Sequence, residues 1–241
     1  MGLLVGGAAV DKVFVGNTPA SKVYLGNTQV WPVKKMYYEP FTANLNWGWT
    51  QFVMNTSTSD YQRAQCANGV AGITNASGTA RPVGYFNKSD LGTDSHYVDV
   101  TLANPIAGTF ANSHQYCEIT MRRQVGHTSD NNIRFSFSPD GSLVIETYNG
   151  TSYTQRASVT GKNLVVGHVL RCVARDNGLH AVYNLTTDPN MVTPLIQWTD
   201  GTRILKYDAA HRTAGMAQNV VYSLFVQYSC HALADWRYGD L

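Results

Sequence analysis

Apolar and polar residues alternate with a period of two along most of the chain from about residue 96 onward. The clearest runs are 96–102, 117–122, 133–138, 143–148, 170–175, 179–185 and 222–232. Successive side chains of a strand point to opposite faces, so each run predicts a half-buried β-strand. Strands that recur every 8–12 residues predict an all-β, antiparallel sandwich or barrel.

Turn residues separate these runs. Pro139-Asp140-Gly141 and Asp176-Asn177-Gly178 each end on a glycine that can adopt positive φ, and Asn149-Gly150 does the same. Residues 208–216 predict a single helical turn, and no amphipathic helix of ordinary length is found.

A ten-residue repeat stands near the N-terminus. Residues 12–20 (KVFVGNTPA) are followed by the similar residues 22–30 (KVYLGNTQV). Gly-Asn is a favoured two-residue loop, so each copy predicts a small β-hairpin. Folding the second copy about its loop places Val23, Leu25, Thr28 and Val30 on one face, and Lys22, Tyr24, Gln29 and Trp31 on the other. Residues 1–10 predict a flexible arm or a short edge strand.

Short two-stranded hairpins are marginally stable in water, so their apolar faces must cover another surface. That surface is either the large domain of the same chain or a partner. We expect residues 1–35 to form a docking or oligomerisation module and residues 36–241 to form the large β domain. The residues expected to dock are Val13, Val15, Val23, Tyr24, Leu25, Val30 and Trp31.

Composition and charge exclude several partners. Charged residues make up 14% of the chain and the net charge is +2, so no broad basic field exists to attract nucleic acid or an anionic membrane. No apolar run approaches the roughly 18–20 residues that span a bilayer. Residues 1–10 also lack the basic residues of a signal peptide. We therefore expect neither a nucleic-acid partner nor membrane insertion.

The cysteines Cys66, Cys117, Cys172 and Cys230 are widely spaced, and at least three lie in strand-like runs. A free cysteine in such a run behaves as a small core residue. We expect free buried thiols rather than disulfides or a zinc site, which indicates synthesis in a reducing cytoplasm.

Residues 168–185 (HVLRCVARDNGLHAVYNL) resemble the central hairpin of concanavalin A-like, laminin G-like jelly rolls. Residues 214–236 resemble the closing strand of the same domains, and the hairpin at 138–143 agrees with them. The resemblance covers roughly residues 36–241 and implies a lectin-like β-sandwich. Such sandwiches include both hydrolases and binding proteins, so the fold alone does not set the function.

Residues 22–32 (KVYLGNTQVWP) resemble the N-terminal segment of minor tail proteins from phages that infect actinobacteria. Together the two resemblances imply a virion tail protein that is synthesised in the host cytoplasm and carries a lectin-like domain. The implied partners are other tail proteins, further copies of the chain, most simply in a trimer, and host cell-wall glycan.

The residue patterns of common catalytic sites are missing. Glucan-cutting enzymes on this sandwich carry an E-x-D-x-x-E strand, and no such triplet occurs here. Glycoside hydrolysis needs two carboxyl groups about 5–10 Å apart. Asp99 and Glu118 are the candidates for such a pair, so a hydrolase remains an alternative. The seven histidines make no i, i+4 pair and are interpreted as surface or core groups.

No cofactor is expected. A calcium site would need clustered oxygen atoms from turns. The candidates are Asp90, Asp94 and Asp99, or Asp130 with Asn131 and Asn132. Ordinary solvated turns are the simpler interpretation.

Sugar recognition needs an aromatic platform together with amides or carboxylates that bind hydroxyl groups. Asn44, Asn46, Trp47 and Trp49 have this composition, and the two tryptophans share a face if the segment is extended. The alternative interpretation is that these tryptophans cap the core of the sandwich. Trp236 is interpreted as structural.

The hypothesis that we favour is a non-enzymatic minor tail protein that binds tail proteins, host glycan or both through shape and hydrogen bonding. Weak affinity for one sugar site would require several copies for avidity. The alternatives are a purely structural tail component, a cell-wall glycan hydrolase and a secreted lectin outside phages. The cysteines and the missing signal peptide disfavour the last.

Overall fold

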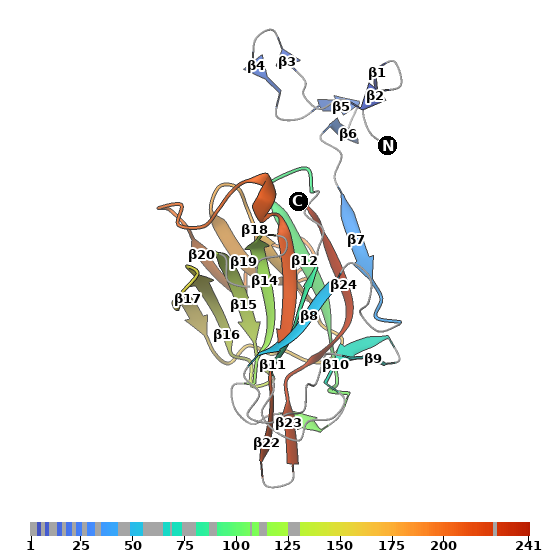
Figure 1. The fold of residues 1–241 in the computed structure, drawn as a ribbon, viewed down its shortest axis with the longest axis vertical. Helices are drawn as coiled ribbons and strands as arrows, with labels where there is room; N and C mark the ends of the chain where they lie inside the picture. The colour runs from blue at the N-terminus through green and yellow to red at the C-terminus, as the bar shows by residue number, and fades with distance from the viewer. Residues whose placement is uncertain are drawn as a thin grey trace.

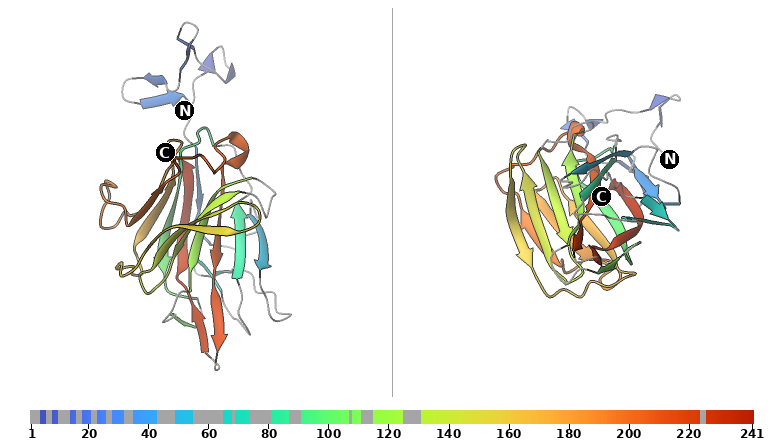
Figure 2. Two further views of the ribbon diagram at one scale, coloured as in Figure 1. Left: turned by 90° about the vertical axis from the view of Figure 1, so that its left-hand side faces the viewer. Right: turned by 60° about the horizontal axis from the view of Figure 1, so that its bottom comes forward.

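Two antiparallel sheets pack face to face in the computed structural model, and three small hairpins lie beyond one end of this sandwich (Figures 1 and 2). The structure describes residues 4–5, 8–9, 14–15, 18–20, 23–25, 28–31, 35–42, 49–54, 65–67, 69–73, 81–86, 91–106, 108–110, 115–124, 131–223 and 226–241. The predicted all-β sandwich is confirmed.

The first sheet has eight strands and contains the chain's predicted central hairpin. Its order is β20 (Ile196–Thr199), β19 (Leu179–Asn184), β18 (Val169–Ala174), β12 (His96–Ala103), β24 (Ala232–Asp240), β10 (Val70–Gly72) and β9 (Gln65–Ala67), while β7 (Met36–Glu39) also pairs with β24. Residues 214–236, which resemble a closing strand, span several strands, and the last of these, β24, lies antiparallel to β12. The single strand predicted for residues 222–232 was wrong, because Ser223 pairs with Val226 across a turn. Because β7 pairs with β24, the start of the domain is held at its C-terminal strand.

The second sheet has seven strands. Its order is β17 (Tyr153–Val159), β16 (Leu143–Tyr148), β15 (Asn132–Phe137), β14 (Cys117–Arg123), β21 (Thr213–Gln218), β11 (Arg81–Phe86) and β8 (Trp49–Met54). A third, small sheet comprises β13 (Thr109–Phe110), β23 (Val226–Ser229) and β22 (Val220–Ser223). It projects from the end of the sandwich opposite the hairpins (Figure 1).

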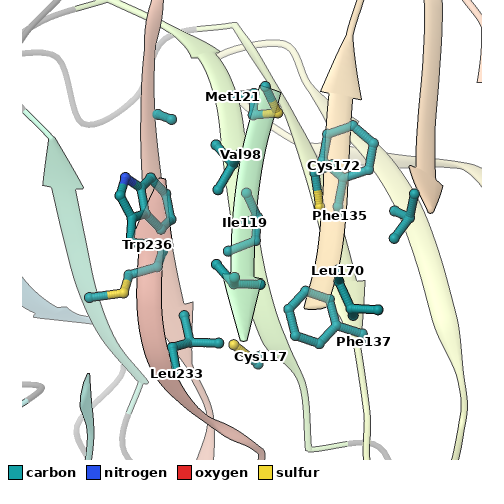
Figure 3. Packing of buried hydrophobic residues seen from close by; sticks show 14 of the residues in the cluster. Val98, Cys117, Ile119, Met121, Phe135, Phe137, Leu170, Cys172, Leu233 and Trp236 are labelled. Carbon is teal, nitrogen blue, oxygen red and sulfur yellow. The ribbon is translucent and has the colours of Figure 1, made fainter. Parts of the chain in front are cut away.

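The inward residues of both sheets form one continuous core. Ile119, Phe135 and Phe137 from the seven-stranded sheet pack against Leu170 and Trp236 from the eight-stranded sheet (Figure 3). Each of these side chains is fully buried, and burial of one large apolar side chain contributes about 1.5–3 kcal/mol. Because side chains alternate along a strand, every second residue of these strands points outward. Trp236 is part of the core, so its predicted structural role is confirmed.

The predicted turns adopt the backbone that their glycines allow. Gly141 has φ of 81°, and a Cβ atom there would lie 2.0 Å from the carbonyl oxygen of Lys162. Gly178 has φ of 89°, and its Cβ would lie 2.8 Å from the carbonyl oxygen of Asp200. Both positions need glycine, because a side chain would clash with backbone atoms.

The N-terminal segment forms three hairpins rather than two. They are β1 (Leu4–Val5) with β2 (Ala8–Ala9), β3 (Phe14–Val15) with β4 (Thr18–Pro19), and β5 (Val23–Leu25) with β6 (Thr28–Trp31). The pairs Val15↔Thr18 and Leu25↔Thr28 confirm the two-residue loops. The expectation of an arm or edge strand at residues 1–10 was wrong, because Val5 pairs with Ala8 in a hairpin one repeat earlier.

The register of the third hairpin differs from the prediction in one place. Tyr24 pairs with Gln29 as expected, but a bulge follows and sets Val23 opposite Trp31 instead of Val30. A bulge adds one residue to one strand and so moves later side chains to the opposite face. The predicted pairing of Val23 with Val30 was therefore wrong.

The expected docking residues are described in part. Val13 lies outside the described residues, as do the side chains of Val15, Val30 and Trp31. Val23 is partly exposed, whereas Tyr24 is 54% and Leu25 is 77% exposed. Two large apolar side chains of the third hairpin thus face outward.

A 3₁₀ helix, η1 (Ala209–His211), is the single helical turn that the sequence predicted. All four cysteines are free, and Cys117, Cys172 and Cys230 are buried, which confirms the expected thiols. Burial raises the pKa of the Cys117 and Cys172 thiols well above the usual value, so both stay protonated at neutral pH. Within the described residues, no helix is long and apolar enough to cross a membrane.

Candidate functional site

The predicted sugar-binding segment is described only at its end. Asn44, Asn46 and Trp47 lie outside the described residues, and so does the side chain of Trp49. The backbone of Trp49 begins β8, an edge strand of the seven-stranded sheet, and pairs with Phe86. The role of this segment therefore stays a prediction.

The outer face of the same sheet carries an arginine between two carboxylates, which we call the Arg134 clamp (Glu118, Arg134 and Glu146). Arg134 Nε donates to Glu146 Oε2 at 2.9 Å, and Arg134 Nη1 donates to Glu118 Oε2 at 3.1 Å. Arg134 Nη2 also binds Glu146 Oε2. The three side chains are 14%, 4% and 20% exposed for Arg134, Glu118 and Glu146.

Sheet register assembles this clamp. Ile119, Phe135 and Ile145 point into the core, so their neighbours Glu118, Arg134 and Glu146 point outward. Arg134 lies directly opposite Glu146 in the β15–β16 pair. Glu118 lies opposite Ser136, which makes it a diagonal neighbour of Arg134.

The clamp leaves one hydrogen-bond acceptor available at its surface. Asn219 Nδ2 donates to Glu118 Oε1 at 3.3 Å, so both oxygens of Glu118 have partners. Both bonds from Arg134 to Glu146 end on Oε2. Among the described residues no hydrogen bond reaches Oε1 of Glu146, so this partly exposed oxygen can accept a ligand hydroxyl.

An aromatic platform lies over the clamp. The guanidinium carbon of Arg134 lies 3.9 Å from the centroid of the Tyr153 ring, and Tyr153 is 42% exposed. Tyr148 lies 4.6 Å from the same ring between centroids. The guanidinium of Arg134 and the tilted ring of Tyr148 both pack against Tyr153 and limit its orientation, while its exposed part can contact an apolar ligand surface.

A groove of about 530 Å³ lies beside β13 and the turn between β15 and β16. Its lining residues are Phe110, Pro139, Asp140, Leu164, Val165, Val166 and His231. The rings of Phe110 and His231 lie 4.8 Å apart between centroids. Burial lowers the pKa of His231 to about 4, although the Ala103 carbonyl opposes this shift, so the imidazole is neutral at physiological pH.

The two acids named for a possible hydrolase do not meet. Asp99 points outward from β12 in the eight-stranded sheet, because Val98 and Val100 point into the core. Glu118 points outward from β14 in the other sheet. The two carboxylates therefore lie on opposite outer faces, and these two acids do not form the pair that the hydrolase alternative would need.

The calcium candidates are also only partly described, since Asp90 and Asp130 lie outside the described residues. Asp94 binds Arg212 at 2.6 Å and Asp99 binds Arg171 at 2.6 Å. In the part of the chain that the structure describes, no group of three or more His, Cys, Asp or Glu side chains could hold a metal ion.

No family model and no curated protein matches the chain. Several solved structures are similar in fold. The VIP36 exoplasmic/lumenal domain in its metal-free form aligns with a TM-score of 0.52 at 12% identity, over 80% of this chain and 85% of that chain. The metal-free Emp46p carbohydrate recognition domain aligns with a TM-score of 0.51 at 13% identity, over 79% and 87%.

The chain has a lectin-like jelly-roll fold. The Ca²⁺-bound VIP36 domain agrees, with a TM-score of 0.52 at 12% identity over 86% of this chain and 90% of that chain. At such identities the likeness concerns the fold alone. The lectin-like jelly roll thus confirms the predicted architecture, whereas its binding residues must come from the geometry of this chain.

Sequence reasoning missed the Arg134 clamp. Arg134, Glu146 and Tyr153 were placed on strands, and none was named as a binding residue. One signal was available, because the turn at residues 139–141 fixes the register that sets Arg134 opposite Glu146. The position of Glu118 needs the β14–β15 register, which no short turn fixes.

Proposed function

We propose that this chain is a non-enzymatic, lectin-like minor tail protein of a phage virion and that it binds host cell-surface glycan at the Arg134 clamp. The observation that carries this proposal is the exposed Tyr153 ring beside a carboxylate with a free oxygen. The apolar face of a sugar ring would stack on Tyr153. A sugar hydroxyl would donate to Oε1 of Glu146, and Arg134 would hold that carboxylate in place.

The structural neighbours support a glycan ligand. One is a carbohydrate recognition domain, and one VIP36 structure is a Ca²⁺/Man-bound form with a TM-score of 0.50. The described part of this chain offers no comparable cluster of metal ligands. We therefore assign the binding to side chains and route no step through a metal ion.

Two tyrosines on opposite outer faces provide a matched test. Tyr153 lies over Arg134, and Tyr38 on β7 lies 5.4 Å from the guanidinium carbon of Arg237, so both are exposed rings beside an arginine. A glycan array on the full chain would find the ligand, and calorimetry would measure its affinity. Tyr153→Ala should weaken binding about two- to tenfold, because a stacked ring contributes about 0.5–1.5 kcal/mol. Tyr38→Ala should leave it unchanged, and equal effects would contradict the proposal.

The phage assignment and the docking role rest on the N-terminal hairpins. Residues 22–32 resemble phage minor tail proteins, and Tyr24 and Leu25 are exposed in the third hairpin. These side chains, with the other predicted docking residues, would bind other tail proteins and further copies of the chain, most simply in a trimer. Replacing Tyr24 and Leu25 by serine should lower incorporation into particles and the mass in sedimentation. Val192→Ser, at a residue that is 78% exposed in another loop, is the control.

Two rival functions have distinct outcomes. Incorporation into particles without any glycan binding would favour a purely structural tail component. Release of reducing ends from wall polysaccharide, lost in Glu118→Gln, would favour a hydrolase. Against the latter stands the side chain of Glu118, which is 4% exposed and held by Arg134 and Asn219.

A further inference from the structure

Residues between the Arg134 clamp and the groove connect the two sites. Cys117 pairs with Phe137 at the end of the β14–β15 pair. Tyr116 precedes Cys117 and Ser138 follows Phe137, so both lie just beyond that end. Pro139 and Asp140 follow at once and line the groove. The strand β15 thus runs from the clamp directly to the wall of the groove.

Tyr116 lies on this path, and it is partly exposed. Asn219 binds both Tyr116 and Glu118: its backbone N–H donates to the Tyr116 carbonyl at 3.0 Å, and its side chain donates to the Glu118 carboxylate. Burial raises the pKa of Tyr116, and the charges of Asp140, Glu146 and Glu118 raise it further. Carboxylates of the clamp and of the groove therefore both act on the Tyr116 phenol, in agreement with the path along β15.

The groove has the composition of a ligand pocket. Its volume of about 530 Å³ lies within the roughly 300–1,000 Å³ of small-molecule sites. Phe110 supplies an aromatic surface and Asp140 supplies a carboxylate, while the ring nitrogens of His231 are buried behind Phe110 and only support it. An apolar platform beside a polar group is what a sugar ring needs.

We propose that the Arg134 clamp and the groove are two subsites of one extended surface that binds an oligosaccharide without carboxylate groups. This inference rests on the proposed function. From Arg134 to Phe137, the last residue of β15, the strand advances by about 10 Å, at about 3.4 Å per residue. The groove begins two residues further on, at Pro139, so the two subsites are separated by more than one sugar ring. A ligand that fills both subsites must therefore contain several sugar residues.

Charge decides the class of oligosaccharide. The clamp and the groove lining contain the carboxylates of Glu118, Glu146 and Asp140 and one guanidinium, that of Arg134. An acidic sugar would meet a net negative surface, and like charges at close range disfavour binding. Neutral sugars and amino sugars meet no such repulsion.

The dependence of affinity on the length of the oligosaccharide tests this proposal. Calorimetry on the full chain would compare mono-, tri- and hexasaccharides of glucose, mannose, galactose and N-acetylglucosamine, with a uronic acid hexasaccharide as the acidic probe. For the sugar that binds, the hexasaccharide should bind at least about tenfold more tightly than the monosaccharide, since a second subsite adds to the first. The uronic acid probe should not bind.

Substitutions in the groove test whether the groove causes this gain in affinity. Phe110→Ala should reduce the gain to about twofold and leave monosaccharide affinity unchanged, because the groove acts on the longer ligand alone. Asp140→Asn keeps the size of the side chain and should reduce the gain as well, and it serves if Phe110→Ala does not fold. Val192→Ser is again the control. Monosaccharide binding without any gain, or the full gain in both variants, would overturn the inference. Failure of every saccharide to bind would instead overturn the proposed function.

Discussion

Each outer face of the sandwich carries an arginine that stacks on a tyrosine and binds carboxylates. On the seven-stranded sheet Arg134 lies 3.9 Å from the Tyr153 ring, and on the eight-stranded sheet Arg171 lies 4.2 Å from the Tyr97 ring. The stacked pairs are alike in geometry. The difference lies in how many carboxylates each guanidinium binds and in what covers the pair.

Arg171 and Asp99 satisfy each other. Arg171 Nε and Nη2 donate to the two oxygens of Asp99 at 2.6 and 2.7 Å, in a bidentate pair. The hydrogen bond to Asp99 raises the pKa of Arg171 despite its burial. A cluster of Val173, Ala181 and Tyr183 is buried beside the pair. A balanced pair of this kind, whose tyrosine packs against the buried cluster, has little left to offer a ligand.

The Arg134 clamp is unbalanced by comparison. One guanidinium serves two carboxylates, and one oxygen of Glu146 is left at the surface beside an exposed ring. An excess of acceptors over donors is what a polyhydroxyl ligand can satisfy. For ligand binding, the presence of an arginine on a sheet therefore matters less than the polar groups around it that are left without partners.

Removal of the clamp arginine has the largest expected effect. Arg134→Met leaves Glu118 and Glu146 without a cation, and breaking a buried ion pair in this way typically costs about 3–5 kcal/mol. Because Glu146 is 20% exposed, we expect a loss of about 3 kcal/mol in the free energy of unfolding in urea. Saccharide binding should be lost as well. Adding Glu118→Gln and Glu146→Gln should restore most of the stability but not the binding, whereas an unchanged unfolding midpoint in Arg134→Met would contradict the role of the clamp.

The balanced pair on the other face should behave differently. Asp99→Asn leaves Arg171 without its carboxylate, and we expect a loss of about 1–2 kcal/mol in stability, since the arginine side chain is 21% exposed and can recruit water. Saccharide affinity should not change. Burial and then the charge of Asp99 raise the pKa of Tyr97, so this substitution should also lower that pKa in a spectrophotometric titration. Weakened glycan binding in Asp99→Asn would place the ligand on the wrong face for our proposal.

Local patterns predicted the jelly roll well because its information is mostly local. Alternation assigned Ile133, Phe135 and Phe137 to the core, and the glycines at 141 and 178 marked tight turns between strands. The extra hairpin at Val5 and Ala8 was missed because Gly6-Gly7 does not match the Gly-Asn of the later copies. Its spacing of ten residues from Gly16-Asn17 was the signal that could have revealed it.

The site was harder to predict because it depends on pairing between distant strands. Glu118 meets Arg134 through the register of β14 and β15, and Asn219 reaches Glu118 across 101 residues. Phe110 and His231 meet at the groove from even further apart in sequence. Periodicity states which way each of these side chains points, but it does not state which strands are neighbours.

The substitution Arg237→Ala has the smallest expected effect, and it tests whether an arginine beside an exposed tyrosine is enough to bind glycan. Arg237 lies on the eight-stranded face beside Tyr38, and it approaches Asp235 at 3.9 Å with its side chain 48% exposed. Exposed pairs of this kind contribute about 0–1 kcal/mol, so Arg237→Ala should change the stability by about 0.5 kcal/mol or less. Glycan affinity should stay within the error of calorimetry, because Arg237 only approaches its carboxylate at 3.9 Å and does not hold it in place by a hydrogen bond as Arg134 does. If Arg237→Ala weakened binding as much as Arg134→Met, exposure of an arginine beside a tyrosine would be the decisive feature. The ligand would then belong to the eight-stranded face.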